Sequence, residues 1–499
     1  MTLRSPVVRR DIAVIVIALL LAYAYVLPRW ADWSQNSRLN LTRALVEQNT
    51  VRIDSYVHNT GDYALYRGHA YTDKAPGPSL AAVPFYALAQ PLIDQPTISK
   101  QLERLAGGGA LSNTLNPEGS GLNRDKIQTF VAQVLLTLII IALPSALSAL
   151  VLERLLASWG VTRGARLSLV LAYGLATPFA IYAGNFYSHS LVAALCITAA
   201  ALLFWLAEGR GTWMRALLIG LLMGYAVISE YPAALICGAL GIYAIVRLRP
   251  RYVAWIIGGG LVPVVLMLVY DMVAFGTPLP IGYSHSALWQ DQHHTGFMSI
   301  SYPSLEALWG LTFGGFRGLF VRAPWLLLAG AGAWIWWRSG KRRAELIAIG
   351  AGTVLTTIFY ASSIMWWGGF GVGPRYLVPI IPLLALMAAP AISTLWKHRL
   401  GASLLIALII LSTALTWIEG TAGQSFPPDT IRATWAGYVL PQWAEGSVAR
   451  NLGSALGLSG ALSLLPLLLA VAGLLALLAV PMRPQSGEQP ATQAASALS

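Results

Sequence analysis

The stretch IAVIVIALLLAYAYVLP, which runs from Ile12 to Pro28, is apolar throughout and contains no charged residue. An α-helix of about 17 to 25 such residues crosses about 30 Å of hydrocarbon. Comparable runs recur along nearly all of the 499 residues, of which 56% are hydrophobic and 11% are charged, and the mean hydropathy is +0.62. The sequence therefore predicts an all-α polytopic membrane protein and excludes an ordinary soluble domain.

Apolar runs of this kind predict about 12 transmembrane helices. They cover residues 12–28, 127–151, 167–184, 187–207, 213–229, 231–246, 252–275, 323–337, 345–364, 376–395, 400–417 and 459–482.

Clusters of Lys and Arg mark alternate loops between these runs. Short cytoplasmic loops carry an excess of Lys and Arg, so a cytoplasmic N-terminus is predicted, because it places every cluster inside. The clusters are Arg4/Arg9/Arg10, Arg154/Arg163/Arg166, Arg210/Arg215, Arg247/Arg249/Arg251, Arg338/Lys341/Arg342/Arg343, Lys397/Arg399 and Arg483. The net charge of +12 reflects these anchors and attraction to anionic lipid, and it does not indicate nucleic-acid binding.

The alternation also divides the chain into segments. We expect a first transmembrane helix at 1–28, an outer loop with interfacial helices and a candidate site at 29–126, transmembrane helices 2–7 at 127–275, an outer loop at 276–322, transmembrane helices 8–11 at 323–417, an outer loop at 418–458, a last transmembrane helix at 459–482 and a disordered cytoplasmic tail at 483–499.

Two segments of the first outer loop predict helices at the membrane surface. Residues 36–48 have apolar side chains set against polar ones with helical spacing, which is typical of a helix in the interface. Residues 78–92 are apolar but short for a span. If they crossed the membrane, every later loop would be inverted and the arginine clusters would lie outside, so we interpret them as a second surface helix.

The segment Tyr71-Thr72-Asp73-Lys74-Ala75-Pro76-Gly77 lies between these two helices. A lysine beside Pro and Gly at a membrane surface favours a site for an anionic headgroup, because its point charge can neutralise a phosphate. Snorkelling of the lysine to lipid headgroups is the alternative interpretation.

Three carboxylates, Asp54, Asp62 and Asp73, lie within twenty residues of one another. Each can serve as a general base, and each is also compatible with a solvated loop acid or a helix cap. Asp54 follows an alternating apolar pattern at residues 51–54, which predicts that it is partly buried. We therefore rank Asp54 first as the base, before Asp62 and Asp73.

Arg38 and the Lys74–Pro78 segment resemble the first outer loop of the GT-C glycosyltransferases, membrane enzymes that use polyprenyl-phosphate sugars. The likeness is in particular to the branch with the protein mannosyltransferases and the lipid A aminoarabinose transferase, and it covers chiefly residues 1–275. That branch carries an acidic pair before an Arg on a surface helix, then a Lys-Pro segment that leads a second surface helix. Gln35 and Asn36 stand here in place of the acidic pair, which puts the usual assignment of the base in doubt.

The stretch WWGGFGVGPRY, residues 366–376, is the second strong signal. Its four glycines allow a backbone to approach a ligand closely, and Trp366 and Trp367 offer faces for a sugar ring. Arg375 opens the next span from the outer side, where an anion can pair with it. A tight interhelical turn within an interfacial aromatic belt is the alternative.

Other polar residues lie at the outer ends of predicted spans or in outer loops. Glu230 and His189 belong to the first group, and such groups are usually functional or paired within the bundle. Arg317 is a second candidate anion contact, or part of a surface turn. The histidines at 285, 293 and 294 come without Cys or a spaced carboxylate set, so no metal site is predicted and a divalent metal is unsupported.

The resemblance implies an inverting membrane glycosyltransferase that moves a sugar from a polyprenyl-phosphate carrier to a lipid, glycan or protein acceptor. It implies a bacterial cytoplasmic (inner) membrane with both termini in the cytoplasm, the active site on the outer face, and no nucleotide or other cofactor. Lys74, Arg375, Arg38 and Arg317 would hold the phosphate, while Tyr71, Trp366 and Trp367 would line the sugar and lipid path. A transporter or flippase of lipid-linked sugars and a non-catalytic membrane scaffold are the alternatives.

Overall fold

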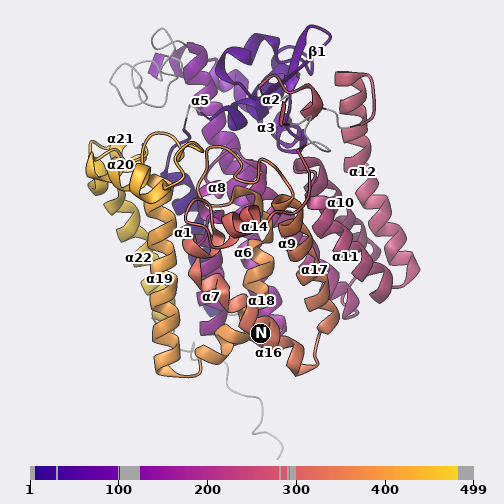
Figure 1. The fold of residues 1–499 in the computed structure, drawn as a ribbon, viewed down its shortest axis with the longest axis vertical. Coiled ribbons are helices and arrows are strands. Elements are labelled where there is room, and N and C mark those ends of the chain that lie inside the picture. Colours follow the sequence, from indigo (N-terminus) through magenta and orange to yellow (C-terminus); the bar gives the residue numbers. More distant parts are fainter. Residues whose placement is uncertain are drawn as a thin grey trace, which may run out of the picture.

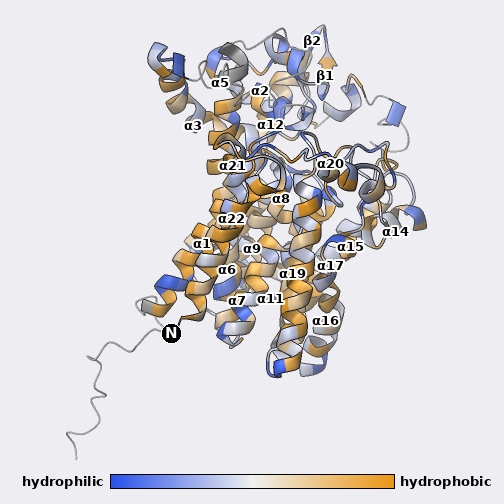
Figure 2. Cartoon of the chain, turned by 90° about the vertical axis from the view of Figure 1, so that its left-hand side faces the viewer, coloured by the Kyte–Doolittle hydropathy of each residue, from blue (hydrophilic) through white to orange (hydrophobic). Residues whose placement is uncertain are grey.

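The computed structural model describes residues 6–29, 32–98, 100–101, 124–279, 282–288, 291–292 and 299–480. Long helices, among them α1 (Pro6–Tyr25) and α6 (Leu143–Ser158), run side by side in a bundle, and residues 32–98 form most of a cap at one end of it (Figure 1). Hydrophobic residues dominate along the bundle, whereas hydrophilic ones gather in the cap and at the far ends of the helices (Figure 2). This distribution fits a bundle in lipid with polar ends in water.

The remaining helices after the cap are apolar for the most part, and a helix satisfies all of its own backbone groups in lipid. In chain order they are α5 (Arg124–Leu136), the π-helical turn η3 (Thr137–Ala142), α7 (Arg163–Leu175), α8 (Phe179–Ala183), α9 (Ser188–Ala207), α10 (Trp213–Ser229), α11 (Ala233–Arg247), α12 (Pro250–Phe275), η4 (Gly282–His285), α14 (Leu305–Thr312), α15 (Leu319–Arg322), η5 (Pro324–Leu327), α16 (Leu328–Ser339), α17 (Arg343–Ala361), η6 (Arg375–Ile380), α18 (Ile381–Leu395), α19 (Arg399–Thr421), the π-helical turn η7 (Trp435–Val439), α20 (Leu440–Ala444), α21 (Leu452–Ala455), η8 (Gly460–Leu464) and α22 (Leu465–Ala479).

Each of the twelve predicted spans contains a helix, so the predicted fold class, an all-α polytopic membrane protein, is confirmed. Among the described residues, seven helical stretches are long and apolar enough to cross a membrane, and α10 and α11 are shorter apolar helices. The predicted run 167–184 is divided, because α7 ends at Leu175 and α8 starts directly after Pro178. The number of crossings and the boundaries of the inner and outer segments stay predictions, and the tail at 483–499 lies outside the described residues.

The cap contains a β-hairpin that the sequence analysis did not foresee. Strands β1 (Tyr63–Tyr66) and β2 (His69–Thr72) pair antiparallel, with Tyr63 opposite Thr72. Arg67 and Gly68 between them both have positive φ, at 50° and 79°, which is the turn that matches the twist of a two-residue hairpin. The hairpin sets the spacing between the residues just before β1 and just after β2.

The two helices predicted in the first outer loop are present as α2 (Trp33–Glu47) and α3 (Gly77–Ile93). The side chain of Asp32 caps α2 by accepting from the backbone N–H groups of Ser34 and Gln35. Residues 34–44 are buried, because α2 packs against α3, β2 and the short helix η1 (Asp54–Asn59). Protein, rather than the membrane surface, therefore encloses most of α2.

The predicted orientation of the cap can be tested with single cysteines. Ser55 in the cap and Ser339 at the far end of α16 are both exposed. In intact cells we expect a membrane-impermeant maleimide to label Ser55→Cys, while Ser339→Cys reacts only after the membrane is opened. The native Cys196 and Cys237 are buried and should add little background. Labelling of Ser339→Cys alone in intact cells would reverse the orientation.

Candidate active site

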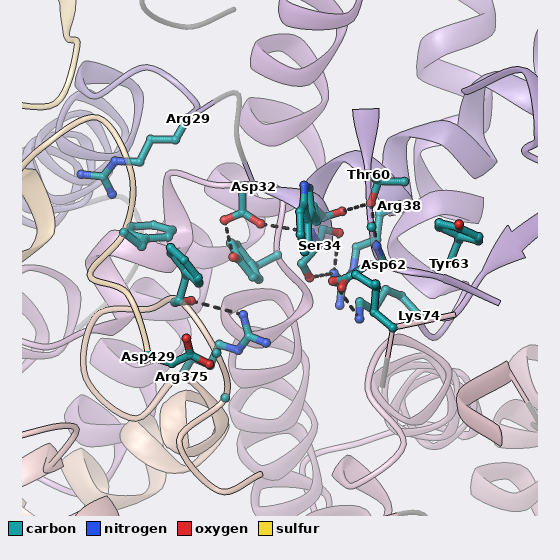
Figure 3. A pocket seen from close by; sticks show the side chains of 18 of the residues that line it. Arg29, Asp32, Ser34, Arg38, Thr60, Asp62, Tyr63, Lys74, Arg375 and Asp429 are labelled. Carbon is teal, nitrogen blue, oxygen red and sulfur yellow. Dashed lines mark hydrogen bonds and ion pairs between the residues drawn. The ribbon is translucent and has the colours of Figure 1, made fainter. Parts of the chain in front are cut away.

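A cavity of about 730 Å³ lies where the cap meets the bundle. Its volume is within the range of about 300 to 1,000 Å³ that is usual for small-molecule sites. Residues from α2, the hairpin region, the start of α9 and two later loops line it, and Figure 3 shows several of them. The charged residues that line the cavity are Arg29, Asp32, Arg38, Asp62, Lys74, Glu230, Arg375 and Asp429.

The Lys74 ammonium is shared between two carboxylates. Its Nζ lies 2.9 Å from Asp62 Oδ2 and 3.1 Å from Asp73 Oδ1. Burial acts to lower the pKa of Lys74, but the two carboxylates outweigh it and raise the pKa, so Lys74 stays charged. Burial raises the pKa of Asp73, which is opposed by Lys74. Two of the three Nζ donors are committed to these carboxylates, which leaves one for a ligand.

A second charged group surrounds Arg38. Its Nη1 donates to the Ser34 hydroxyl at 2.6 Å and its Nη2 to the Ser188 hydroxyl at 3.0 Å. Ser188 in turn donates to Glu230, whose Oε2 lies 4.0 Å from Arg38 Nη2 and 3.6 Å from His189 Nδ1. The first turns of α2 and α9 and the end of α10 bring these residues together, and all but Ser188 line the cavity.

Arg375 is the cavity cation with the fewest polar partners. Its guanidinium lies 5.6 Å from the Tyr187 ring and 5.4 Å from the Tyr376 ring, and Nη1 donates to Phe370 O at 3.5 Å. Within the described residues, Nε has no hydrogen-bond partner and no carboxylate lies within 4 Å. Gly368 and Gly369, both with φ near +70°, turn the preceding loop so that it packs against this side chain. Arg375 therefore has donors that an anion could accept from, and its role as an anion contact stays a prediction.

Asp32, Arg29 and Asp429 line the cavity but were not identified from the sequence. The first is the N-cap of α2, and the predicted helix began four residues later, at Asn36, so the cap was overlooked. Its Oδ2 accepts from the Tyr187 hydroxyl. Burial raises the pKa of Asp32, while Tyr187 and Arg375 oppose that rise. The sequence signal that could have identified Asp32 is an Asp placed directly before the first turn of a helix, where it can act as the N-cap.

Asp54 does not line the cavity, and the prediction that it is partly buried beside Lys74 is wrong. It begins η1, and its side chain is 46% exposed. Its Oδ2 lies 2.9 Å from His69 Nδ1 and its Oδ1 accepts from Ala70 N at 2.6 Å. The carboxylate therefore ties η1 to β2. The alternating pattern at residues 51–54 placed Ile53, not Asp54, in the core.

Three predicted aromatic contacts also lie away from the cavity. Tyr71 is buried in the cap, where its ring lies 5.3 Å from that of Phe275. Trp366 packs on Gly310, whose missing side chain leaves room for the indole. Trp367 donates from Nε1 to Asp429 Oδ2 at 3.1 Å. Neither Trp366 nor Trp367 is among the lining residues, so the two indoles support the walls of the site instead.

Arg317 is not an anion contact, because its Nη1 and Nη2 groups already donate to backbone carbonyls. It is fully buried, and it donates to Gly371 O at 2.5 Å, Gly369 O at 2.7 Å and Pro427 O at 3.2 Å. Burial lowers its pKa to about 10, so it remains charged at neutral pH. Arg317 thus joins the glycine loop before Arg375 to the loop that contains Pro427.

The departure at Gln35 and Asn36 has a structural explanation. Gln35 is fully buried, and its amide contacts Asn185, Gln133 and the backbone N–H of Phe186. Asn36 donates to Asn59 O at 2.8 Å. Both amides cross-link α2 to its neighbours, a task that needs donors as well as acceptors.

The described residues contain no group of three His, Cys, Asp or Glu side chains that could hold a metal ion. Of the histidine cluster noted in the sequence, His285 packs against Tyr66 and Phe275. His293 and His294 lie outside the described part of the chain.

No protein-family model matches the chain, and no curated protein sequence matches it. It is similar to solved structures of ArnT from Cupriavidus metallidurans, bound to undecaprenyl phosphate (16% identity, 78% of this chain and 60% of that chain, TM-score 0.45) and in the apo state (16%, 94% and 73%, TM-score 0.48). It is also similar to the archaeal oligosaccharyltransferase AglB from Archaeoglobus fulgidus, in complex with an inhibitory peptide and a dolichol-phosphate (12%, 81% and 56%, TM-score 0.42).

All three TM-scores are below 0.5 and all three identities are below 25%, so the resemblance inferred from the sequence stays a prediction. The chain spans 60% of the length of the first of these structures. At TM-scores below 0.5 the likeness decides neither the substrate nor the residues of the site.

Because Arg317 holds the glycine loop through three backbone carbonyls, its replacement should lower the stability of the protein. Arg317→Lys keeps the charge but cannot reach three carbonyls, so we expect the free energy of unfolding to fall by about 1 to 3 kcal/mol. Arg432→Lys is the matched control, since Arg432 lies over the same Phe316 ring but is exposed. Thermal unfolding of the purified variants measures the difference. Equal midpoints for the two variants would show that the carbonyl contacts do not hold the loop.

Proposed function

We propose that the protein is a GT-C-type glycosyltransferase that moves a sugar from a polyprenyl-phosphate carrier to an acceptor on the outer face of a bacterial cytoplasmic membrane. The single observation that carries this proposal is the cavity between cap and bundle. It is lined by Arg375, which has no carboxylate within 4 Å among the described residues, and by Asp62, which is paired with Lys74. The apolar bundle beside it is a suitable environment for a polyprenyl chain.

In this proposal Arg375 is the main contact of the carrier phosphate. The phosphate gains negative charge as the sugar leaves, and a cation that is already fixed in place stabilises that charge without reorganisation. Arg375 has donors to spare, and Tyr187 and Tyr376 restrict its position. The third Nζ donor of Lys74 is the second contact.

Asp62 serves as the general base. Its carboxylate lines the cavity and lies 2.9 Å from Lys74 Nζ. The acceptor oxygen attacks the anomeric carbon and its proton passes to Asp62, while the bond from that carbon to the phosphate oxygen breaks and its electron pair stays on the phosphate. Lys74 then keeps Asp73 as its counter-ion, so protonation of Asp62 leaves no buried cation unpaired. Attack opposite the leaving phosphate gives inversion.

Glu230, His189 and Arg38 form the part of the cavity that suits the hydroxyl groups of the sugar. They combine acceptors and donors in one group, and the Tyr376 ring, stacked on Tyr360 at 4.5 Å, lies beside His189. Carboxylate, imidazole and guanidinium groups beside an aromatic face can fix the orientation of a small polar ligand.

The two alternatives are less well supported. A transporter usually shows repeated halves and broken helices at mid-membrane, whereas the charged residues described here collect at one end of the bundle. A scaffold has no need for a cavity lined by an arginine such as Arg375, which has no carboxylate within 4 Å among the described residues. A transfer assay on membranes with a labelled polyprenyl-phosphate sugar distinguishes all three.

The base is tested by Asp62→Asn, which keeps the shape of the side chain and removes the proton acceptor. We expect transfer to fall by at least about a hundredfold, because general-base catalysis contributes that much or more. Asp54→Asn is the matched control in the same loop, and it should retain activity since Asp54 faces His69 outside the cavity. Rates are measured in the transfer assay with equal amounts of protein. An active Asp62→Asn, or an inactive but folded Asp54→Asn, would contradict the assignment.

The phosphate contacts are tested by Lys74→Ala and Arg375→Ala. Each removes a cation close to the developing charge, so we expect a loss on the order of 3 kcal/mol, or about a hundredfold in rate. Arg52→Ala, at an exposed position of the cap, is the control. Near-normal turnover in both cavity variants would place the phosphate elsewhere.

A further inference from the structure

Arg29 lies on the far side of the cavity from Lys74, with Asp32 between them in the view of Figure 3. Arg29 follows α1 in the chain, and only 5% of its surface is exposed. Its guanidinium lies 4.3 Å from the centre of the Phe426 ring. None of the steps of the proposed reaction uses this residue.

Only part of the Arg29 guanidinium is hydrogen-bonded. Nη2 donates to Gly420 O at 2.8 Å and to Gly423 O at 3.4 Å. Nε is buried, and neither Nε nor Nη1 has a hydrogen-bond partner within the described part of the chain. Because Nη2 belongs to both of the two-donor edges of a guanidinium, Nη1 is the donor that remains for a charge-assisted hydrogen bond to a phosphate or carboxylate oxygen.

The charge of Arg29 is also uncompensated at short range. No carboxylate of the described residues lies within 4 Å of it. Burial lowers its pKa to about 10, while Asp32 and three tyrosines act in the opposite direction from further away. It is therefore a cation at neutral pH, and a buried cation without a counter-ion is costly to the fold unless a ligand provides one.

Arg29 is separated from the proposed phosphate contact by aromatic rings. It lies over Phe426, whose ring is 6.2 Å from that of Tyr187, and Arg375 lies on Tyr187 at 5.6 Å. The two arginines thus face different rings, and each can bind its own anion. Two carboxylates, Asp32 and Asp429, also line the cavity. They suit hydroxyl groups and would repel a second anionic group there.

From these contacts we propose that Arg29 is the centre of an acceptor subsite for a sugar that carries one acidic group, a phosphate or a carboxylate. The acidic group binds Arg29 through Nη1, and the hydroxyls of the same sugar bind Asp32 and Asp429. The assignment to the acceptor rests on the proposed function, in which Arg375 and Lys74 hold the carrier phosphate. The anion site itself depends only on the geometry of Arg29.

The test uses the full-length protein in detergent, saturated with undecaprenyl phosphate, and titrates it with glucose 1-phosphate or glucuronate by calorimetry. Neutral glucose is the control ligand. We expect at least one of the two acidic sugars to bind, and its affinity to fall at least tenfold in Arg29→Gln. Arg432→Gln, which removes an exposed arginine over Phe316 and Trp367, should bind as the wild type does. The acid that binds identifies the acidic group.

A second variant guards against a folding defect, because Arg29 also holds the carbonyl of Gly420 at the end of α19. Asp429→Asn keeps the acceptor for Trp367 Nε1 and removes one negative charge from the subsite. It should bind the acidic sugar severalfold more tightly than the wild type. Unchanged affinity in both Arg29→Gln and Asp429→Asn overturns the subsite, as does failure of both acids to bind.

The outcomes also separate this subsite from the proposed function. If the acidic sugar displaces undecaprenyl phosphate, the cavity has one anion site and the inference is wrong, while the carrier proposal stands. If undecaprenyl phosphate does not bind but the acidic sugar does so through Arg29, the anion site stands and the carrier proposal fails.

Discussion

A lysine ammonium shared by two buried carboxylates organises the boundary between the cap and the bundle. Asp62 precedes β1 by one residue and Asp73 and Lys74 follow β2, so the ion cluster closes the open end of the hairpin. The register of the hairpin therefore fixes the distance between these charges. A slip by one residue would turn every side chain of a strand to the opposite face and separate the cluster. The α3 helix starts three residues after Lys74, so the same cluster also fixes where the second cap helix enters.

Arginines join the loops of the cavity wall to this frame through backbone carbonyls. Arg317 joins the loops that contain Gly371 and Pro427, and Arg29 joins the end of α1 to Gly420. Arg322 pairs with Glu419 in a fully buried salt bridge at 2.8 Å, and Glu419 also accepts from Gly373 N at 3.5 Å. Breaking one partner of such a pair is far more costly than the pair is stabilising. The walls of the cavity are therefore held by charges whose loss would loosen them together.

The helices could be predicted from the sequence, whereas many of the residues that line the cavity could not. Apolar length predicts a helix at every span, since helical hydrogen bonds close within a few residues. Lys74, Asp62, Arg38 and Arg375 were found because each lies in a distinctive local context. Asp54 was misplaced because its exposure depends on β2, which was not foreseen. Arg317 was mistaken for a ligand contact and Arg29 was not identified, because carbonyls more than fifty residues away decide how an arginine is used.

The distribution of partners among the cavity cations suggests a division between stability and chemistry. Lys74 and Arg38 lie near carboxylates, so the protein itself provides counter-ions for their charges. Arg375 and Arg29 lie on aromatic rings and have no carboxylate within 4 Å, in the portion of the chain that is described. Rings offset only a small part of the cost of a buried charge. The fold therefore bears a cost at these two positions that a balanced pair would avoid. Such a cost is expected where a site is complementary to charge that it meets only when ligand is bound, since a cation neutralised in advance would stabilise that charge less.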